Sequence, residues 1–251
     1  MKLLNNIHLV GSGVQGVGIS HDTDCHIYLL DGGGGELALI DAGGGMDVPA
    51  ILRNIEQDGF DPADVKHLIL THAHFDHAGG AAGLREALGG PATYLYKDVA
   101  AFLADGDEEA INLNKAKQVG LFPPDVCYHA CPVDVSYDEG ATIKVGCLSL
   151  RVIHTPGHCQ GHCSFLLEHE GQTIFFGGDL VFFGGKILLQ NIWDCDLQAH
   201  LASIEKFRGA GIDVFLPGHL TFSLRNGQRH IDAALKVIDQ LLVPPNFAYA
   251  W

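Results

Sequence analysis

The chain has 251 residues, which is enough for one large domain or for one domain with an appendage. Hydrophobic residues make up 47% of the chain and charged residues 18%, so it can bury a sizeable core and does not resemble a disordered protein. Lys and Arg total 15 against 30 Asp and Glu, and a net charge of −15 argues against binding to nucleic acid or to an anionic membrane surface.

Hydrophobic patterning predicts strands first and then alternating strands and helices, twice over. The expected strands are, in chain order, 25–31, 36–41, 66–71, 93–96, 147–155, 163–169, 172–176 and 213–216. The expected helices are 47–58, 80–88, 97–104, 107–119, 196–208 and 230–242.

These elements form two β-rich halves, each followed by helices. Two such halves predict an α/β (α+β) fold, a four-layer αββα sandwich in which two sheets pack face to face with helices outside. We expect one domain over residues 1–251, with a helical insertion at about 97–124, of which residues 105–124 are a candidate lid.

Histidine is the unusual residue of this composition, because its 15 copies equal all the Lys and Arg together. The densest group is the motif HAHFDH, which directly follows an apolar strand and contains His72, His74, Asp76 and His77. Alternate residues of an extended chain point the same way, so His72 and His74 can converge on one ion. Imidazole and carboxylate are ligands that zinc prefers, and the motif therefore predicts a metal site.

Three further ligand-type residues follow apolar strands at glycine-containing turns. They are His158 in HTPGH, Asp179 in FFGGD and His219 in FLPGH. The strands should deliver all three to one edge of a sheet, and glycine allows a close approach of backbone and metal. Together with the HAHFDH motif they supply enough ligands for two adjacent metal ions.

These motifs, in this order and spacing, resemble those of the metallo-β-lactamase superfamily, and the resemblance runs from about Cys25 to His219. It implies the αββα fold and a dinuclear zinc hydrolase, with iron or manganese as alternative metals. Position by position, it implies one metal held by His72, His74 and His158, and a second held by the remaining ligands. Those remaining ligands are Asp76, His77 and His219, with Asp179 bridging the two metals.

The resemblance also implies supporting residues. Asp41 matches an aspartate that orients the histidine loop through hydrogen bonds, and we interpret His162 as a structural neighbour of the His158 loop. Aromatic, apolar and basic residues flanking the ligand loops are weaker candidates for the substrate pocket: Phe75, Phe182, Phe183, Lys186, Trp193 and Phe222.

The expected reaction is hydrolysis of an ester, lactone or thioester of a small molecule by a hydroxide that bridges two zinc ions. Asp76 is the expected catalytic residue, orienting the hydroxide and carrying a proton to the leaving group. Two alternatives stay open within the family: a mononuclear iron oxidoreductase of the persulfide dioxygenase type, and an amide hydrolase of the β-lactamase type. Phe182 stands where many lactonases of this family have a tyrosine, which weakens the lactonase interpretation.

Location and partners follow from the remaining features. No stretch approaches 18 uninterrupted apolar residues and the first residues lack a long apolar run, so neither a transmembrane helix nor a signal peptide is expected. A cytoplasmic enzyme with seven free thiols is the resulting expectation. The apolar, proline-containing segment 243–251 leaves two options, docking on a second copy in a homodimer or covering a sheet edge of its own chain.

Overall fold

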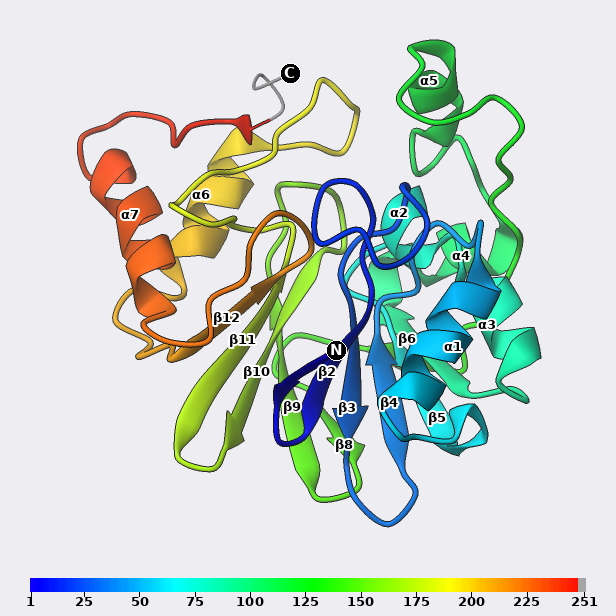
Figure 1. Ribbon diagram of the computed structural model, residues 1–251. Helices are drawn as coiled ribbons and strands as arrows, with labels where there is room; N and C mark the ends of the chain where they lie inside the picture. The colour runs from blue at the N-terminus through cyan, green and yellow to red at the C-terminus, as the bar shows by residue number, and fades with distance from the viewer. Residues whose placement is uncertain (248–251) are drawn as a thin grey trace. The chain divides into compact units, whose positions relative to one another are not determined.

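The computed structural model describes residues 1–247, and the last four residues of the segment expected to dock lie outside that range. The contacts of the chain divide it into two compact units, and Figure 1 shows their elements. Unit 1 comprises Met1–Tyr137 and Lys144–Leu148, and unit 2 comprises Asp138–Ile143 and the chain from Ser149 onward. The expectation of a single domain stays a prediction.

Unit 1 is built on a seven-stranded sheet in which the strands lie in sequence order. The strands are β1 (Lys2–Leu4), β2 (Ile7–Gly11), β3 (Ile27–Asp31), β4 (Leu37–Ile40), β5 (Val65–Ile69), β6 (Ala92–Tyr96) and β7 (Val135–Tyr137). Strands β1 to β4 pair antiparallel, whereas β4 to β7 pair parallel. Parallel neighbours need a crossover connection, and helices provide it between β4, β5 and β6.

Helix α1 (Val48–Gln57) makes the first crossover and shows how local sequence determines an element. The Asp47 side chain accepts a hydrogen bond from the backbone N–H of Ala50 at 3.0 Å and so caps the first turn. Ile51 and Ile55, one turn apart, are both buried against the sheet side of the unit. The helix ends before Gly59, whose φ of 93° is costly for other residues. The predicted helix 47–58 is therefore confirmed within a residue at each end.

The remaining helices of unit 1 are short. They are η1 (Pro62–Asp64), α2 (Phe75–Ala78), α3 (Ala81–Ala87), η2 (Lys97–Val99), α4 (Ala100–Asp105) and α5 (Leu113–Gln118). The prediction of one helix over 107–119 is wrong in its first half, because α5 begins only at Leu113. Asn112, just before it, has a left-handed backbone with φ of 59°, which a continuous right-handed helix does not accommodate.

Unit 2 carries a five-stranded sheet in the order β12-β11-β10-β9-β8. Its strands are β8 (Thr142–Val145), which crosses the boundary between the units, β9 (Leu148–His154), β10 (Cys163–His169), β11 (Gln172–Gly178) and β12 (Val214–Pro217). Strand β10 pairs antiparallel with both β9 and β11, and β11 pairs parallel with β12. Strands β9, β11 and β12 therefore run in the same direction. This direction determines where the ligand-type residues that follow these strands lie.

Two amphipathic helices belong to unit 2, α6 (Leu197–Glu205) and α7 (Gln228–Ile238). Their buried faces share one hydrophobic cluster with the sheet, in which the rings of Phe175, Phe207 and Phe215 meet. Helix α7 ends four residues earlier than the predicted 230–242, and Leu241 after it is 96% exposed.

Both units combine one sheet with helices, so the fold is mixed α/β with two sheets, as expected. Within residues 1–247, no helix has the length and apolar character needed to cross a membrane.

Candidate metal centre

In unit 1, the metal-ligand motif begins where a parallel strand ends. Strands β4 and β5 are parallel neighbours, so their carboxyl ends meet at one edge of the sheet. Asp41 directly follows β4, and only Leu70 and Thr71 separate β5 from the HAHFDH motif. Open α/β sheets bind ligands outside the carboxyl ends of their strands, so this edge is a natural site.

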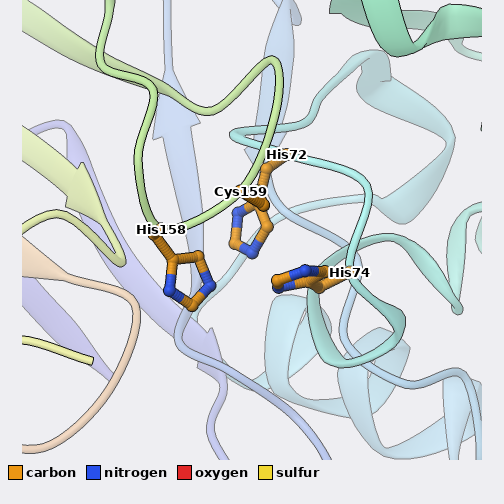
Figure 2. A group of neighbouring side chains, drawn as sticks. All are labelled: His72, His74, His158 and Cys159. Carbon is orange, nitrogen blue, oxygen red and sulfur yellow. The ribbon is translucent and has the colours of Figure 1, made fainter. Parts of the chain in front are cut away.

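The four ligand-type side chains of the motif form what we term the N-terminal ligand group: His72, His74, Asp76 and His77. Figure 2 shows the His72 and His74 rings, which leave the segment after β5, and their centroids lie 4.8 Å apart. The His77 ring lies 4.1 Å from that of His72, because helix α2 turns the chain back. Asp76 completes the group, with a carboxylate oxygen 3.9 Å from His77 Nε2. One short segment thus presents three imidazoles and a carboxylate together.

Asp41 and Thr71 hold two of these imidazoles in place. Asp41 accepts hydrogen bonds from the Thr71 backbone N–H at 2.7 Å, from the Thr71 hydroxyl at 2.9 Å and from His77 Nδ1 at 2.9 Å. The Thr71 oxygen also lies 2.9 Å from His72 Nδ1. Because the hydroxyl proton goes to the carboxylate, its lone pair accepts from Nδ1–H of His72. Both rings then carry their proton on Nδ1 and present Nε2 to a metal.

Asp41 adopts an unfavourable backbone conformation in this role. Its φ is 65°, in the left-handed region that non-glycine residues rarely adopt, and its side chain is only 2% exposed. Backbone strain of this kind persists where surrounding bonds over-determine it, as the three donors to Asp41 do.

Cys25 is a neighbour of this site that the sequence did not reveal. Its sulfur, an Asp41 oxygen and a His77 nitrogen all lie within 4.8 Å of one another, and its backbone N–H donates to the Asp76 carbonyl at 3.1 Å. Burial raises the pKa of the Cys25 thiol well above its usual range. Because Asp41 and His77 Nδ1 already bond to each other, we interpret this trio as support for the motif.

In unit 2, three strands that run in the same direction deliver the other ligand-type residues. His158 follows β9, Asp179 follows β11 and His219 follows β12, so all three emerge at one edge of the sheet. We term these residues the C-terminal ligand group. The strands thus place these three residues at one edge of the sheet, as the sequence predicted.

The C-terminal ligand group converges on one carboxylate oxygen. Asp179 Oδ2 lies 3.6 Å from Nε2 of His158 and 3.6 Å from Nε2 of His219, and all three side chains are buried. His158 Nδ1 donates to the backbone carbonyl of Leu188 at 2.9 Å, which leaves its Nε2 for the Asp179 side. His158 and Cys159, on the loop after β9, are also drawn in Figure 2.

His162 supports Asp179 through the backbone. Its Nε2 accepts the Asp179 backbone N–H at 2.9 Å, so the ring proton is on Nδ1, which contacts the Thr155 hydroxyl at 2.8 Å. That hydroxyl lies 3.1 Å from Ser164, which donates to the Gly177 carbonyl. A buried polar chain thus connects the loop after β9 to the end of β11.

The loop that carries His158 packs tightly on helix α6. A Cβ atom on Gly157 would lie 2.2 Å from the backbone nitrogen of His200, and its φ of 129° also favours glycine. The His200 ring is fully buried, and burial lowers its pKa to about 4, so the ring is neutral at pH 7.

Segment 107–128 of unit 1, which contains α5, contacts the HAHFDH motif at two points, on residues that lie between the ligand-type side chains. The Tyr128 hydroxyl donates at 2.9 Å to the carbonyl of Ala73, the residue between His72 and His74. The Phe122 ring packs edge-on against Phe75, next to His74, with centroids 5.0 Å apart. The sequence indicated that this insertion is helical but not that it is anchored on the ligand motif.

The residues proposed to line a substrate pocket differ in exposure. Phe75 and Phe182 are buried in the cores of their units, and Phe182 packs on Phe247. The other four are partly or well exposed, and their role stays a prediction: Phe183, Lys186, Trp193 and Phe222. Trp193, 55% exposed, lines an open cavity of about 570 Å³ in unit 2 together with Cys159 and Cys195.

Comparison with known proteins agrees with the motifs. The profile of the metallo-β-lactamase superfamily matches residues 22–219, which is most of the chain. An acyl-coenzyme A thioesterase, MBLAC2 of Gallus gallus, is 33% identical over 210 residues, covering 77% of this chain and 72% of that protein. The hydroxyacylglutathione hydrolase GloC of Haemophilus influenzae is 30% identical over 148 residues, or 59% of this chain and 62% of the relative.

Several curated relatives are longer proteins, and the chain spans 47% of the atrochrysone carboxyl ACP thioesterase of Passalora fulva, which is 30% identical. Among solved structures, the subclass B3 metallo-β-lactamase BJP-1 of Bradyrhizobium japonicum superposes with a TM-score of 0.72 at 21% identity, covering 96% of this chain and 91% of that one. A metallo-β-lactamase of Cronobacter sakazakii gives 0.69 at 24% identity, covering 96% and 84%. The expected fold is thereby confirmed, and the chain belongs to the metallo-β-lactamase superfamily.

Proposed function

We propose that this protein hydrolyses an acyl thioester of a small molecule, with two zinc ions held by the N-terminal and C-terminal ligand groups. The observation that carries the proposal is the completeness of the donor set. Each ligand motif of the family is present, and within each unit the ligand-type side chains gather at the carboxyl ends of strands.

The chemistry of the donors fits zinc. Imidazole nitrogen and carboxylate oxygen are its usual ligands alongside thiolate. In each unit a histidine already uses its Nδ1 in a hydrogen bond, His77 with Asp41 and His158 with the Leu188 carbonyl, which leaves Nε2 as the donor. Following the family pattern, His72, His74 and His158 would hold one ion. Asp76, His77 and His219 would hold the other, with Asp179 shared.

Two bound divalent ions would acidify a water molecule and polarise the carbonyl of the substrate. Asp76 is the protein group proposed to orient the attacking water, and its partial exposure leaves it accessible to substrate, with 22% of the side chain exposed. Attack on the acyl carbon breaks the carbon–sulfur bond, and Asp76 passes the proton of the water to the departing thiolate. No protein nucleophile is needed, and the products are a carboxylate and a thiol.

Thioesters are favoured over the other bonds by the relatives. MBLAC2, similar over about three quarters of both chains, is named for acyl-coenzyme A, and other relatives are named for acyl carrier protein thioesters and hydroxyacylglutathione. The β-lactamases similar in structure are below 25% identical, so they support the fold and not the substrate.

The test is a substrate panel with quantified metal. Protein purified without added metal should contain close to two zinc ions per chain and should hydrolyse thioesters faster than lactones, aryl esters, phosphodiesters or β-lactams. Asp179→Asn should lower both the zinc content and the rate, whereas Asp22→Asn, at an exposed position of unit 1, should leave both unchanged.

Two results would contradict the proposal. One tightly held iron ion with oxygen-dependent turnover of a persulfide would identify an oxidoreductase instead. A preference for β-lactams with two zinc ions would keep the metal centre but replace the substrate.

A further inference from the structure

We infer that segment 107–128 is the element that selects the acyl group, and that it favours a long, apolar acyl chain bound by Val119 and Leu121. This inference rests on the proposed function, since it names the part of a thioester that the segment would bind.

The first observation is an exposed apolar pair, followed a few residues later by the exposed Pro123 and Pro124. Val119 is 80% exposed and Leu121 is 49% exposed, on either side of Gly120. Figure 1 shows α5 standing away from the other helices of unit 1, and the two residues directly follow it. Exposed apolar residues scattered singly are ordinary, but a pair at a protruding tip has a cost in water that a ligand would remove.

The second observation is that this tip is fixed in place. The Glu108 carboxylate binds Lys117 Nζ at 2.6 Å through one oxygen and accepts the Tyr128 backbone N–H at 3.1 Å through the other. The carboxylate therefore ties the start of the segment to α5 and to the end of the segment. A pre-ordered apolar surface loses little entropy when it binds a ligand.

The third observation is that the tip is continuous with residues that contact the HAHFDH motif. Immediately after Leu121, Phe122 packs on Phe75, the residue next to His74, and the Tyr128 hydroxyl binds the Ala73 carbonyl. If the carbonyl of a thioester is held at the ligand group, its alkyl chain would extend towards Val119 and Leu121, because their segment is anchored on the HAHFDH motif.

The occupant is an alkyl chain and not a second copy of the protein. A stable protein interface buries about 800 Å² on each partner and takes roughly 20–30 residues a side, far more than the short stretch 119–124 offers. An alkyl chain, by contrast, gains from contact with even two apolar side chains, because each methylene removed from water contributes separately.

The experiment measures kcat/KM on N-acetylcysteamine thioesters with acyl chains of two to twelve carbons. For the unmodified protein kcat/KM should rise with chain length. The double variant Val119→Ser with Leu121→Ser should lose about tenfold on decanoyl and longer chains while the acetyl thioester is unaffected. The matched control is Leu241→Ser with Leu242→Ser, two exposed apolar residues after α7, which should behave as the unmodified protein at every length.

Three outcomes would overturn the inference: an equal loss at all chain lengths, no loss at any length, or a dimer of the unmodified protein that the double variant converts to monomer. If no thioester is hydrolysed at all, the proposed function fails and the inference is judged by binding. Calorimetric titration with the S-decyl thioether of N-acetylcysteamine should still show about tenfold weaker binding to the double variant. Equal binding to both proteins would then refute the inference by itself.

Discussion

Removing the Thr71 hydroxyl should weaken metal binding without removing any ligand. Thr71→Val keeps the shape of the side chain but deletes the hydroxyl that donates to Asp41 at 2.9 Å and faces His72 Nδ1 at 2.9 Å. A hydrogen bond to a charged group contributes about 1.5–3 kcal/mol, and a buried donor left without a partner costs about 1–3 kcal/mol. We therefore expect the free energy of unfolding to fall by about 3 kcal/mol, because the two effects share one hydroxyl and do not add fully.

The zinc affinity should fall about 10- to 100-fold, as is usual when a group that orients a ligand is lost. Competition with a chromophoric chelator measures that affinity directly and does not depend on turnover. Thr71→Ser is the control, because it keeps the hydroxyl and loses one methyl group. Equal zinc affinities of the Val and Ser variants would show that the hydroxyl does not orient His72, and the reasoning would then be refuted.

Three other predictions concern the fold, acid sensitivity and the metal. Gly157→Ala should lower the free energy of unfolding, measured in urea, by about 2–4 kcal/mol, because its Cβ would meet the His200 backbone. Gly171→Ala is also at positive φ but in open space, so it should lower that free energy by only about 1 kcal/mol. Equal losses in the two variants would contradict the packing argument. Burial lowers the pKa of His230 to about 4, below the 6.5 of an unfolded histidine. As the pH falls, the unfolded chain therefore takes up this proton before the folded chain does. The free energy of unfolding should fall between pH 6.5 and pH 4, by about 3 kcal/mol at most. His230→Asn, which can still accept the Gly184 N–H, should flatten that pH dependence in metal-free protein, and an unchanged slope would point to other groups. Chelation should lower Tm, and zinc at about 1,000 times its Kd should raise the free energy of unfolding by about 4 kcal/mol. A Tm that does not change with zinc would argue against any metal bound by the folded state.

Local signals in the sequence were sufficient where one residue decides the conformation. Asp47 and Gly59 bound a helix whose apolar residues recur at helical spacing, and α1 is found where they predict it. The hydrophobic pattern was insufficient for 107–119, because it does not report the left-handed backbone of Asn112, which comes just before α5. The strands β1, β2, β7 and β8 were also missed.

The placement of the ligand-type residues was the most predictable part of the site. Each follows an apolar strand, so pairing and direction alone bring His158, Asp179 and His219 to one edge of the second sheet. The supporting residues were harder. Asp41 was found through its place in a family pattern, whereas Cys25 lies 16 residues before it and carries no motif of its own. The anchor between Tyr128 and Ala73 joins positions 55 residues apart, a separation that no local pattern reports.

The two units orient an imidazole by different means, and this affects which mutations each can tolerate. In unit 1 the partner of His77 is the Asp41 side chain, so any substitution that lacks a side-chain oxygen at this point removes the acceptor. In unit 2 the partner of His158 is the main-chain carbonyl of Leu188, an acceptor that every amino acid supplies. Position 188 is therefore free to vary in identity as long as the backbone keeps its path. A saturation library should find residue 41 nearly invariant and residue 188 permissive, although each accepts a hydrogen bond from the Nδ1 of one histidine.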